Sequence, residues 1–135
     1  MERAYRRTAY RVDDGGDSFE FRIGIRHPKL DALLDRHKAR SWAFVTAYNP
    51  YSQPLDDRAN RRRQAAFERS LFLPFLHGKG QGLVGNWTPE ASVLLMGITP
   101  QRARRLGSQW EQAAVVIGVR GGRPRLQWPQ PAIFM

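Results

Sequence analysis

The sequence predicts one α+β domain, in which a mixed or largely antiparallel sheet of about five to six strands carries about three helices packed on it. Three observations lead to this class. The chain has 135 residues, which is the length of a single domain. Segments with strand-like alternation open and close it, and three segments with helical periodicity lie between further strand-like segments. The order is β-β-α-β-α-β-α-β-β, and we expect the helices on one side of the sheet.

The first predicted elements are a hairpin and a helix. Alternating segments flank the turn residues 13–17, which gives a hairpin with one solvated face. Pro28 is a favourable first residue for a helix, and Leu30, Leu33 and Leu34 fall on one apolar stripe. We expect this helix to end near residue 38.

The third predicted strand covers residues 41–49. It has little polar character on either face, which is typical of a strand in the middle of a sheet. Residues 49–54 contain two prolines, which remove hydrogen-bond donors, so the ladder stops there in a structured loop. A second helix follows, capped by Asp56 and ending near Pro74.

The segment 78–90 is rich in glycine and has no periodicity, so we predict an irregular loop that packs through Trp87. Gly80, Gly82 and Gly85 match the spacing G-x-G-x-x-G. In dinucleotide-binding proteins this motif follows a strand and opens a helix, whereas here it follows a predicted helix. We therefore interpret it as a surface loop.

The last predicted elements are two strands, 92–98 and 113–119, on either side of a helix that starts with the cap Thr99 and Pro100. Two glycines then turn the chain into a final strand, 123–128. Residues 129–135 are expected to form a loosely held tail. The predicted domain is 1–128.

Composition excludes several classes of protein. The chain has no Cys, so disulfide frameworks, Cys-based zinc sites and thiol nucleophiles are excluded. Its three His are scattered, and we predict neither a metal site nor a cofactor. No export signal is visible and the apolar runs are far too short to cross a bilayer. We expect a cytoplasmic protein without a membrane partner.

Charge points to an acidic partner. The chain carries 22 Lys and Arg against 12 Asp and Glu, a net charge of +10, and 19 of these cations are Arg. An anionic small molecule or a nucleic acid is the predicted partner. Arg102 and Arg105 lie one turn apart near a helix start without acidic residues, which predicts an anion site. The alternative is a solvated basic surface, and the sequence indicates no oligomeric state.

The strongest local signal is residues 46–53, a row of neutral hydrogen-bonding side chains at the end of a buried strand. Open sheets often bind ligands at such a strand end. We expect four polar residues, Asn49, Asn60, Glu90 and Gln112, to meet there. The alternative is that the loop side chains bond only their own backbone. The predicted ligand-binding residues are Thr46, Asn49, Tyr51, Ser52, Asn60, Glu90 and Gln112.

Several spaced motifs carry a resemblance. The patterns are T-A-x-N-P-x-S at 46–52, a helix Asn at 60, W-x-x-E-x-S at 87–92 and aromatic-x-Q-x-A at 110–114. Together they resemble a family of small bacterial proteins catalogued only as a domain of unknown function. Trp110 stands where that pattern commonly has Phe. The resemblance implies no activity, cofactor or catalytic residue.

The leading hypothesis is a small cytoplasmic binding module for an anionic or nucleotide-like ligand, with the polar loop supplying hydrogen bonds and Arg supplying charge. A second is an RNA or single-stranded DNA binder that stacks bases on Trp42, Phe44 and Tyr48. A third is an enzyme with Glu90 as acid/base or Ser52 as nucleophile, although no complete catalytic motif is present. A fourth is an interaction protein that uses its Arg face on an acidic partner.

Overall fold

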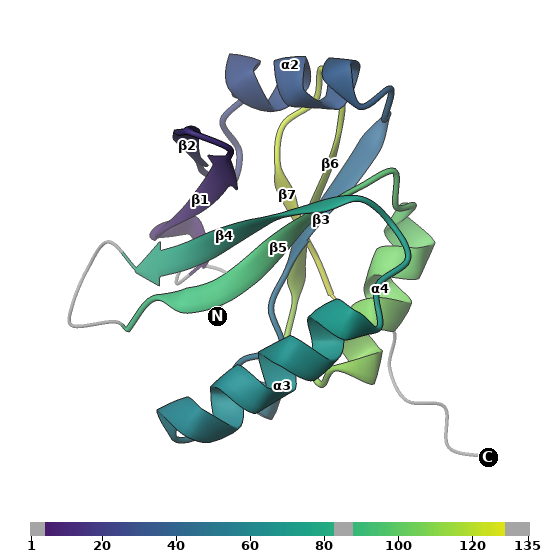
Figure 1. Ribbon diagram of the computed structural model, residues 1–135. Coiled ribbons are helices and arrows are strands. Elements are labelled where there is room, and N and C mark those ends of the chain that lie inside the picture. The colour runs from purple at the N-terminus through teal and green to yellow at the C-terminus, as the bar shows by residue number, and fades with distance from the viewer. Residues whose placement is uncertain (1–4, 83–87, 129–135) are drawn as a thin grey trace.

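A computed structural model describes residues 5–82 and 88–128 of the chain. Over these residues the fold is a curled antiparallel sheet of seven strands with three helices (Figure 1), which confirms the α+β class. The predicted count of five to six strands was too low. The strands are β1 (Thr8–Asp14), β2 (Asp17–Phe21), β3 (Ser41–Val45), β4 (Phe75–Gly82), β5 (Glu90–Met96), β6 (Val115–Val119) and β7 (Arg125–Gln127). The helices are α2 (Pro28–Arg36), α3 (Asp57–Arg69) and α4 (Pro100–Gln109), and η1 (Pro50–Ser52) is a short 3₁₀ turn.

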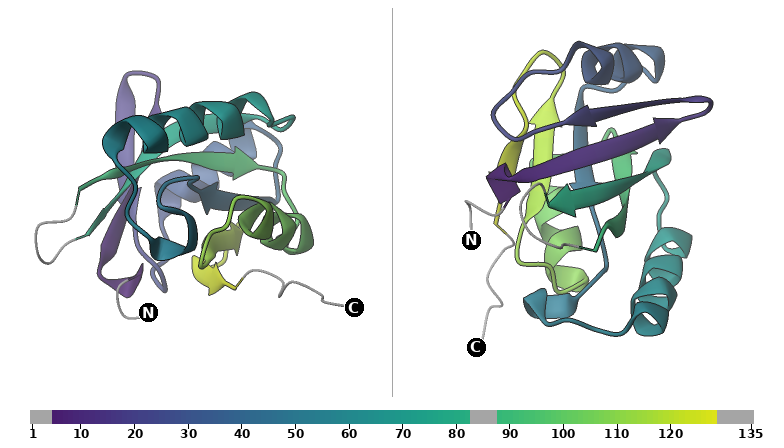
Figure 2. Two further views of the ribbon diagram at one scale, coloured as in Figure 1. Left: turned by 90° about the horizontal axis from the view of Figure 1, so that it is seen from below. Right: turned by 90° about the vertical axis from the view of Figure 1, so that its left-hand side faces the viewer.

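The sheet has the order β2-β1-β4-β5-β3-β6-β7, and every neighbouring pair is antiparallel. Its curl brings the two ends of this order together (Figure 2). The Gly24 amide, just after β2, donates a hydrogen bond to the carbonyl of Pro124, just before β7, at 2.8 Å. The sheet therefore has a concave face that is enclosed on several sides.

Strand β3 is central because both of its faces are apolar. Trp42 and Phe44 point to the concave face, where Phe21 of the distant strand β2 contacts both rings. Ala43 and Val45 point to the opposite, convex face. Each face therefore needs its own cover, and the expectation of helices on one side was wrong.

The three helices divide between these faces. The predicted stripe Leu30, Leu33 and Leu34 of α2 is buried in the concave core. Helices α3 and α4 pack on the convex face through Phe67 and Ala103. Helix α2 covers one end of the concave face and leaves the other end open (Figures 1 and 2).

Strand β4 corrects the prediction of an irregular loop at 78–90. It pairs with both β1 and β5, so its backbone is held on two sides without any side-chain pattern. Gly78 shows why glycine is used: a Cβ there would lie 2.2 Å from the Arg11 carbonyl oxygen and 2.9 Å from the Phe44 ring. Trp87, Gly85 and the predicted tail 129–135 lie outside the described residues.

The predicted helix starts are confirmed. The Asp56 carboxylate accepts the Ala59 amide at 2.7 Å, and the Thr99 hydroxyl accepts the Arg102 amide at 3.2 Å. Helix α3 ends at Arg69, earlier than the proline at 74 suggested. Within residues 5–82 and 88–128, no helix is long and apolar enough to cross a membrane.

Candidate functional site

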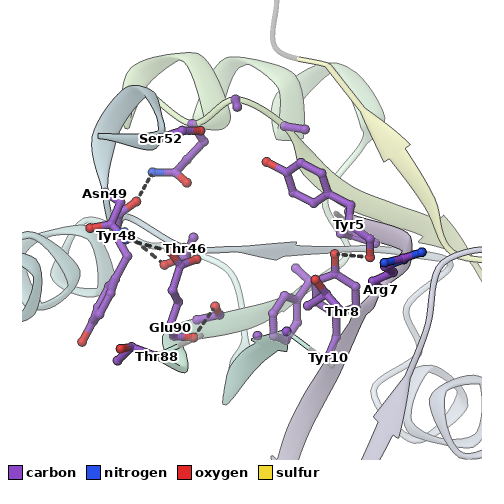
Figure 3. Close-up of a pocket in the computed structure, with 18 of the residues that line it drawn as sticks. Tyr5, Arg7, Thr8, Tyr10, Thr46, Tyr48, Asn49, Ser52, Thr88 and Glu90 are labelled. Carbon is purple, nitrogen blue, oxygen red and sulfur yellow. Dashed lines mark hydrogen bonds between the residues drawn. The ribbon is translucent and has the colours of Figure 1, made fainter. Parts of the chain in front are cut away.

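A cavity of about 820 Å³ opens on the concave face, beyond the aromatic core (Figure 3). It is formed where β1, β3, β4, β5 and β6 run out from under α2. Tyr5, Thr8 and Tyr10 lie on one side of it, and Glu90, Thr88 and Tyr48 lie on the other. Segments from both ends of the chain and from its middle therefore line one space.

The side chains change in character along each strand of the concave face. On β3 and the residues after it, Trp42 and Phe44 are followed by Thr46 at the next position on the same face. On β5, Leu94 is buried in the core, and Glu90 lines the cavity. Hydrogen-bonding groups thus replace large apolar groups where the cavity opens.

Asn49 organises the polar side of the cavity. Its backbone is in the left-handed region, with φ of 48°, a conformation that asparagine tolerates. Its amide N–H donates to Asn60 Oδ1 at 2.8 Å, and Asn60 Nδ2 donates back to Asn49 Oδ1 at 2.7 Å. The Leu55 amide donates to the same Oδ1 at 3.0 Å. With its oxygen taken by two donors, Asn49 directs its Nδ2 at Glu90 Oε1, 2.9 Å away.

Glu90 is the acidic residue of the cavity among the described residues. Burial raises the pKa of its carboxyl, and the hydrogen bond from Asn49 opposes part of that rise. The carboxyl is therefore half-buried, fixed in orientation by one amide, and costly to ionise. Such a group can accept hydrogen bonds from a ligand or exchange a proton with it.

Thr46 and Gln112 hold the backbone at the end of β3. The Thr46 hydroxyl donates to the carbonyl of Ala91 at 2.7 Å and accepts the Tyr48 amide at 3.0 Å. Gln112 Nε2 donates to the carbonyl of Tyr48 at 3.1 Å. Both side chains also line the cavity, so they connect its wall to three segments of the fold.

Three tyrosines, Tyr5, Tyr10 and Tyr48, are among the residues that line the cavity. Tyr10 donates to the carbonyl of Tyr5 at 3.2 Å. Burial is the main cause that raises the pKa of Tyr5, Tyr10 and Tyr48. These hydroxyls therefore stay neutral and can donate or accept at physiological pH.

The structure brings most of the predicted site residues together. Asn49, Asn60 and Glu90 are joined by hydrogen bonds, and Gln112 binds the adjacent backbone, as expected. Asn60 is buried behind Asn49 and does not line the cavity, and Tyr51 is 70% exposed outside it. A role for any of them in ligand binding stays a prediction. The predicted residues that line the cavity are Thr46, Asn49, Ser52, Glu90 and Gln112.

Arg102 and Arg105 lie elsewhere. They line a second, shallower hollow of about 350 Å³ with the exposed Phe72 and the partly buried Leu106, whereas among the described residues the cation that lines the concave cavity is Arg7. Leu95 in that hollow belongs to the convex core. The two predicted anion-binding arginines are therefore on the other side of the sheet from the concave cavity and cannot contact a small ligand held there.

The structure also limits the hypothesis of a nucleic-acid binder that stacks bases on Trp42, Phe44 and Tyr48. Trp42 is 1% and Phe44 is 4% exposed, so these rings cannot stack on the bases of a nucleic acid. Within the described part of the chain, no group of three His, Cys, Asp or Glu could hold a metal ion.

Sequence reasoning missed one wall of the cavity, formed by Tyr5, Arg7, Thr8, Tyr10 and the glycines of β4. The available signal was the glycine at every second position of 78–82. Glycine inside a strand often marks close approach of a ligand or another group to the backbone.

Comparison with known proteins gives one match. No curated protein and no solved structure matches the chain. A family model described as "Protein of unknown function (DUF3293)" matches residues 45–115, which is more than half of the chain. The matched region includes the polar loop, Asn60, Glu90 and Gln112. The chain therefore belongs to the DUF3293 family.

Proposed function

We propose that this protein is a small binding module that holds a nucleotide-like molecule in the concave cavity. The observation that carries the proposal is the cavity itself, in which aromatic rings, hydroxyls, amides and one carboxyl converge. Its volume of about 820 Å³ falls in the range of small-molecule sites, which is roughly 300–1,000 Å³. A cytoplasmic location stays a prediction from the sequence.

Hydrogen bonds within the protein account for some of the polar residues near the cavity but not for all of them. Asn60 and Thr46 have structural bonds that account for their presence. Ser52, Thr88 and Glu90 also face an accessible space, which a purely structural network would not need. This arrangement supports a ligand in contact with the loop.

Charge narrows the class of ligand. Arg7 and Glu90 are the cationic and the carboxylate residues that line the cavity in the described part of the chain, so their charges offset each other. A polyanion is poorly matched to such a site. A nucleotide-like molecule suits it better, with an anionic group near Arg7 and a neutral ring deeper inside.

Filling the cavity tests the proposal. A Cβ on Gly80 would lie 3.9–4.0 Å from Thr8 and Tyr10 atoms, which is ordinary contact, so a side chain can start there and the two methyl groups of Gly80→Val add bulk beside the cavity. We expect this variant to fold normally and to lose binding of GMP, AMP, CMP or UMP by at least about tenfold in calorimetry, because it occupies the ligand's space.

Arg102→Ala is the matched control, because Arg102 lines the other hollow. It is expected to bind as the wild type does. Equal binding by Gly80→Val and the wild type, or no binding of any of these nucleotides to the wild type, would contradict the proposal.

Acid–base catalysis by Glu90 is a second candidate. It is favoured by the raised pKa of a carboxyl that lines a cavity. Glu90→Gln keeps the shape and removes the proton. Intact ligand binding with loss of turnover in this variant would identify an enzyme, and absence of turnover in both proteins would support a binding module.

A further inference from the structure

We infer that the ligand presents two adjacent N–H donors to the Glu90 carboxylate, as the N1–H and 2-amino group of a guanine ring do, while the ring lies over Gly80. This inference rests on the proposed function and names the chemical class of its ligand. It comes from the placement of three residues in one row of the sheet.

Tyr10, Gly80 and Glu90 form this row across β1, β4 and β5. Tyr10 is the register partner of Gly80 on one side, and Glu90 is its partner on the other. Directly paired residues in antiparallel strands have their side chains on the same face and about 5 Å apart. Because Gly80 has no side chain, none stands between the Tyr10 ring and the Glu90 carboxyl in this row, and all three residues line the cavity.

Gly78 in the neighbouring row shows what can take the place of a side chain on this face. Gly78 lies on the same face two residues earlier, and there the Phe44 ring occupies the space: a Cβ would be 2.9 Å from it. Gly80 has no atom so close, since its Cβ would be in ordinary contact with Thr8 at 3.9 Å and with the Tyr10 ring at 4.0 Å. The Arg11 carbonyl oxygen, 2.2 Å from such a Cβ, and the Phe44 ring thus both exclude a side chain at 78. A flat ring from a ligand would explain the glycine at 80 in the same way.

The hydrogen-bonding state of Glu90 indicates that the edge of this ring carries N–H donors. Asn49 holds Oε1 from one direction and cannot turn, because its own oxygen accepts bonds from Leu55 and Asn60. Among the residues that the structure describes, no ion pair joins Glu90 to Lys or Arg. A half-buried carboxylate gains most from further N–H donors, and two parallel donors match its two oxygens.

Guanosine and inosine test this edge, because they differ only in the 2-amino group. We expect the wild type to bind guanosine about tenfold more tightly than inosine, as measured by calorimetry. Glu90→Gln should lose about tenfold in guanosine affinity and bind the two nucleosides alike, since one carboxylate oxygen becomes an N–H donor. Circular dichroism and the melting temperature check that the variant folds.

Protonation gives a second measurement that needs no variant. The donors bind the ionised carboxylate, so guanosine affinity is expected to rise with pH until Glu90 is fully ionised. At pH values where Glu90 is still partly protonated, binding should release a proton from its carboxyl. Calorimetry in two buffers of different ionisation enthalpy detects this release.

The outcomes separate the inference from the proposed function. If GMP binds and Gly80→Val abolishes its binding, but guanosine and inosine bind equally or Glu90→Gln binds more tightly, the ligand's donor edge is refuted and the cavity remains the site. If no nucleoside or nucleotide binds the wild type, the proposed function fails and the inference fails with it.

Discussion

The two halves of the concave face use the same strands in opposite ways. In the closed half, under α2, Trp42, Leu94 and Met96 are buried against the helix and one another. In the open half, just after β3 and at the start of the antiparallel strand β5, the side chains are Thr46, Ser92 and Glu90. Because every second residue of a strand faces the same side, this change in character reflects the choice of residue and not the backbone.

This difference indicates that the closed half stabilises the fold, whereas the open half lowers stability and holds the candidate site. Burial of large apolar side chains in the closed half supplies free energy of folding. The open half leaves a cavity unfilled and partly desolvates the Glu90 carboxyl, both of which cost stability. A fold without a use for the cavity gains nothing from this arrangement.

Removing a ring from the closed half has the largest expected effect. Trp42→Ala deletes a 1% exposed side chain that packs against Phe21 and over Gly118, and we expect a loss of about 3–5 kcal/mol in the free energy of unfolding. Tyr48→Ala at the open end should cost less than about 2 kcal/mol. Urea unfolding measures both, and equal losses would contradict the division between the halves.

Breaking the hydrogen-bond network of the open half comes next. Asn60→Ala leaves the Asn49 amide without its acceptor and removes one of the two donors to the Asn49 side-chain oxygen, so we expect a loss of about 2 kcal/mol. The orientation of Asn49 toward Glu90 should also be lost, together with ligand binding. Asn60→Asp is a second variant, which keeps the acceptor for the Asn49 amide and replaces the donor by an oxygen that faces the Asn49 side-chain oxygen and the Leu55 carbonyl in a buried position. An Asn60→Ala protein as stable as the wild type would show that the network is dispensable.

The closed half was easier to predict from sequence than the open half. The leucines of α2 and the alternation in β3 carry the periodicity that burial imposes, and the caps Asp56 and Thr99 have local signatures. Strand β4 has glycine at every second position of its latter half, so it shows no apolar pattern although its backbone pairs on both sides.

The sequence predicted those residues of the candidate site that follow a buried strand directly or that belong to a family motif. Asn49 and Ser52 follow a buried strand directly, and Glu90 and Gln112 belong to the motifs that carried the resemblance. Tyr10 reaches the cavity through the register of β1 with β4, which depends on residues about seventy positions apart. The placement of Arg102 depends on which face α4 covers, and that is a property of the whole sheet.

The pH dependence of stability distinguishes the halves by a smaller effect. The folded-state pKa of Glu90 is raised, so its protonated form stabilises the fold at low pH, and that contribution is lost as pH rises through the folded-state pKa. Glu90→Gln lacks this loss. We therefore expect the variant to melt higher than the wild type at neutral pH and the difference to shrink as pH falls through the range where Glu90 is protonated. A constant difference across thermal scans at several pH values would contradict a buried, strained carboxyl.

The smallest expected effect uses the convex face as a reference. The double variant Arg102→Ala and Arg105→Ala removes two exposed cations from the second hollow, so the free energy of unfolding should change by no more than about 0.5 kcal/mol and GMP binding in the cavity should not change. Salt provides the independent measurement. A protein that neutralises six phosphates of a nucleic acid loses affinity as salt is added, with a slope of about −4 to −5 in a plot of log affinity against log salt concentration. A ligand that contacts Arg7 alone should give a slope no steeper than about −1. A steep slope that becomes shallow in the double variant would mean that Arg102 and Arg105 bind the ligand. The convex face, and neither half of the concave face, would then be the binding surface.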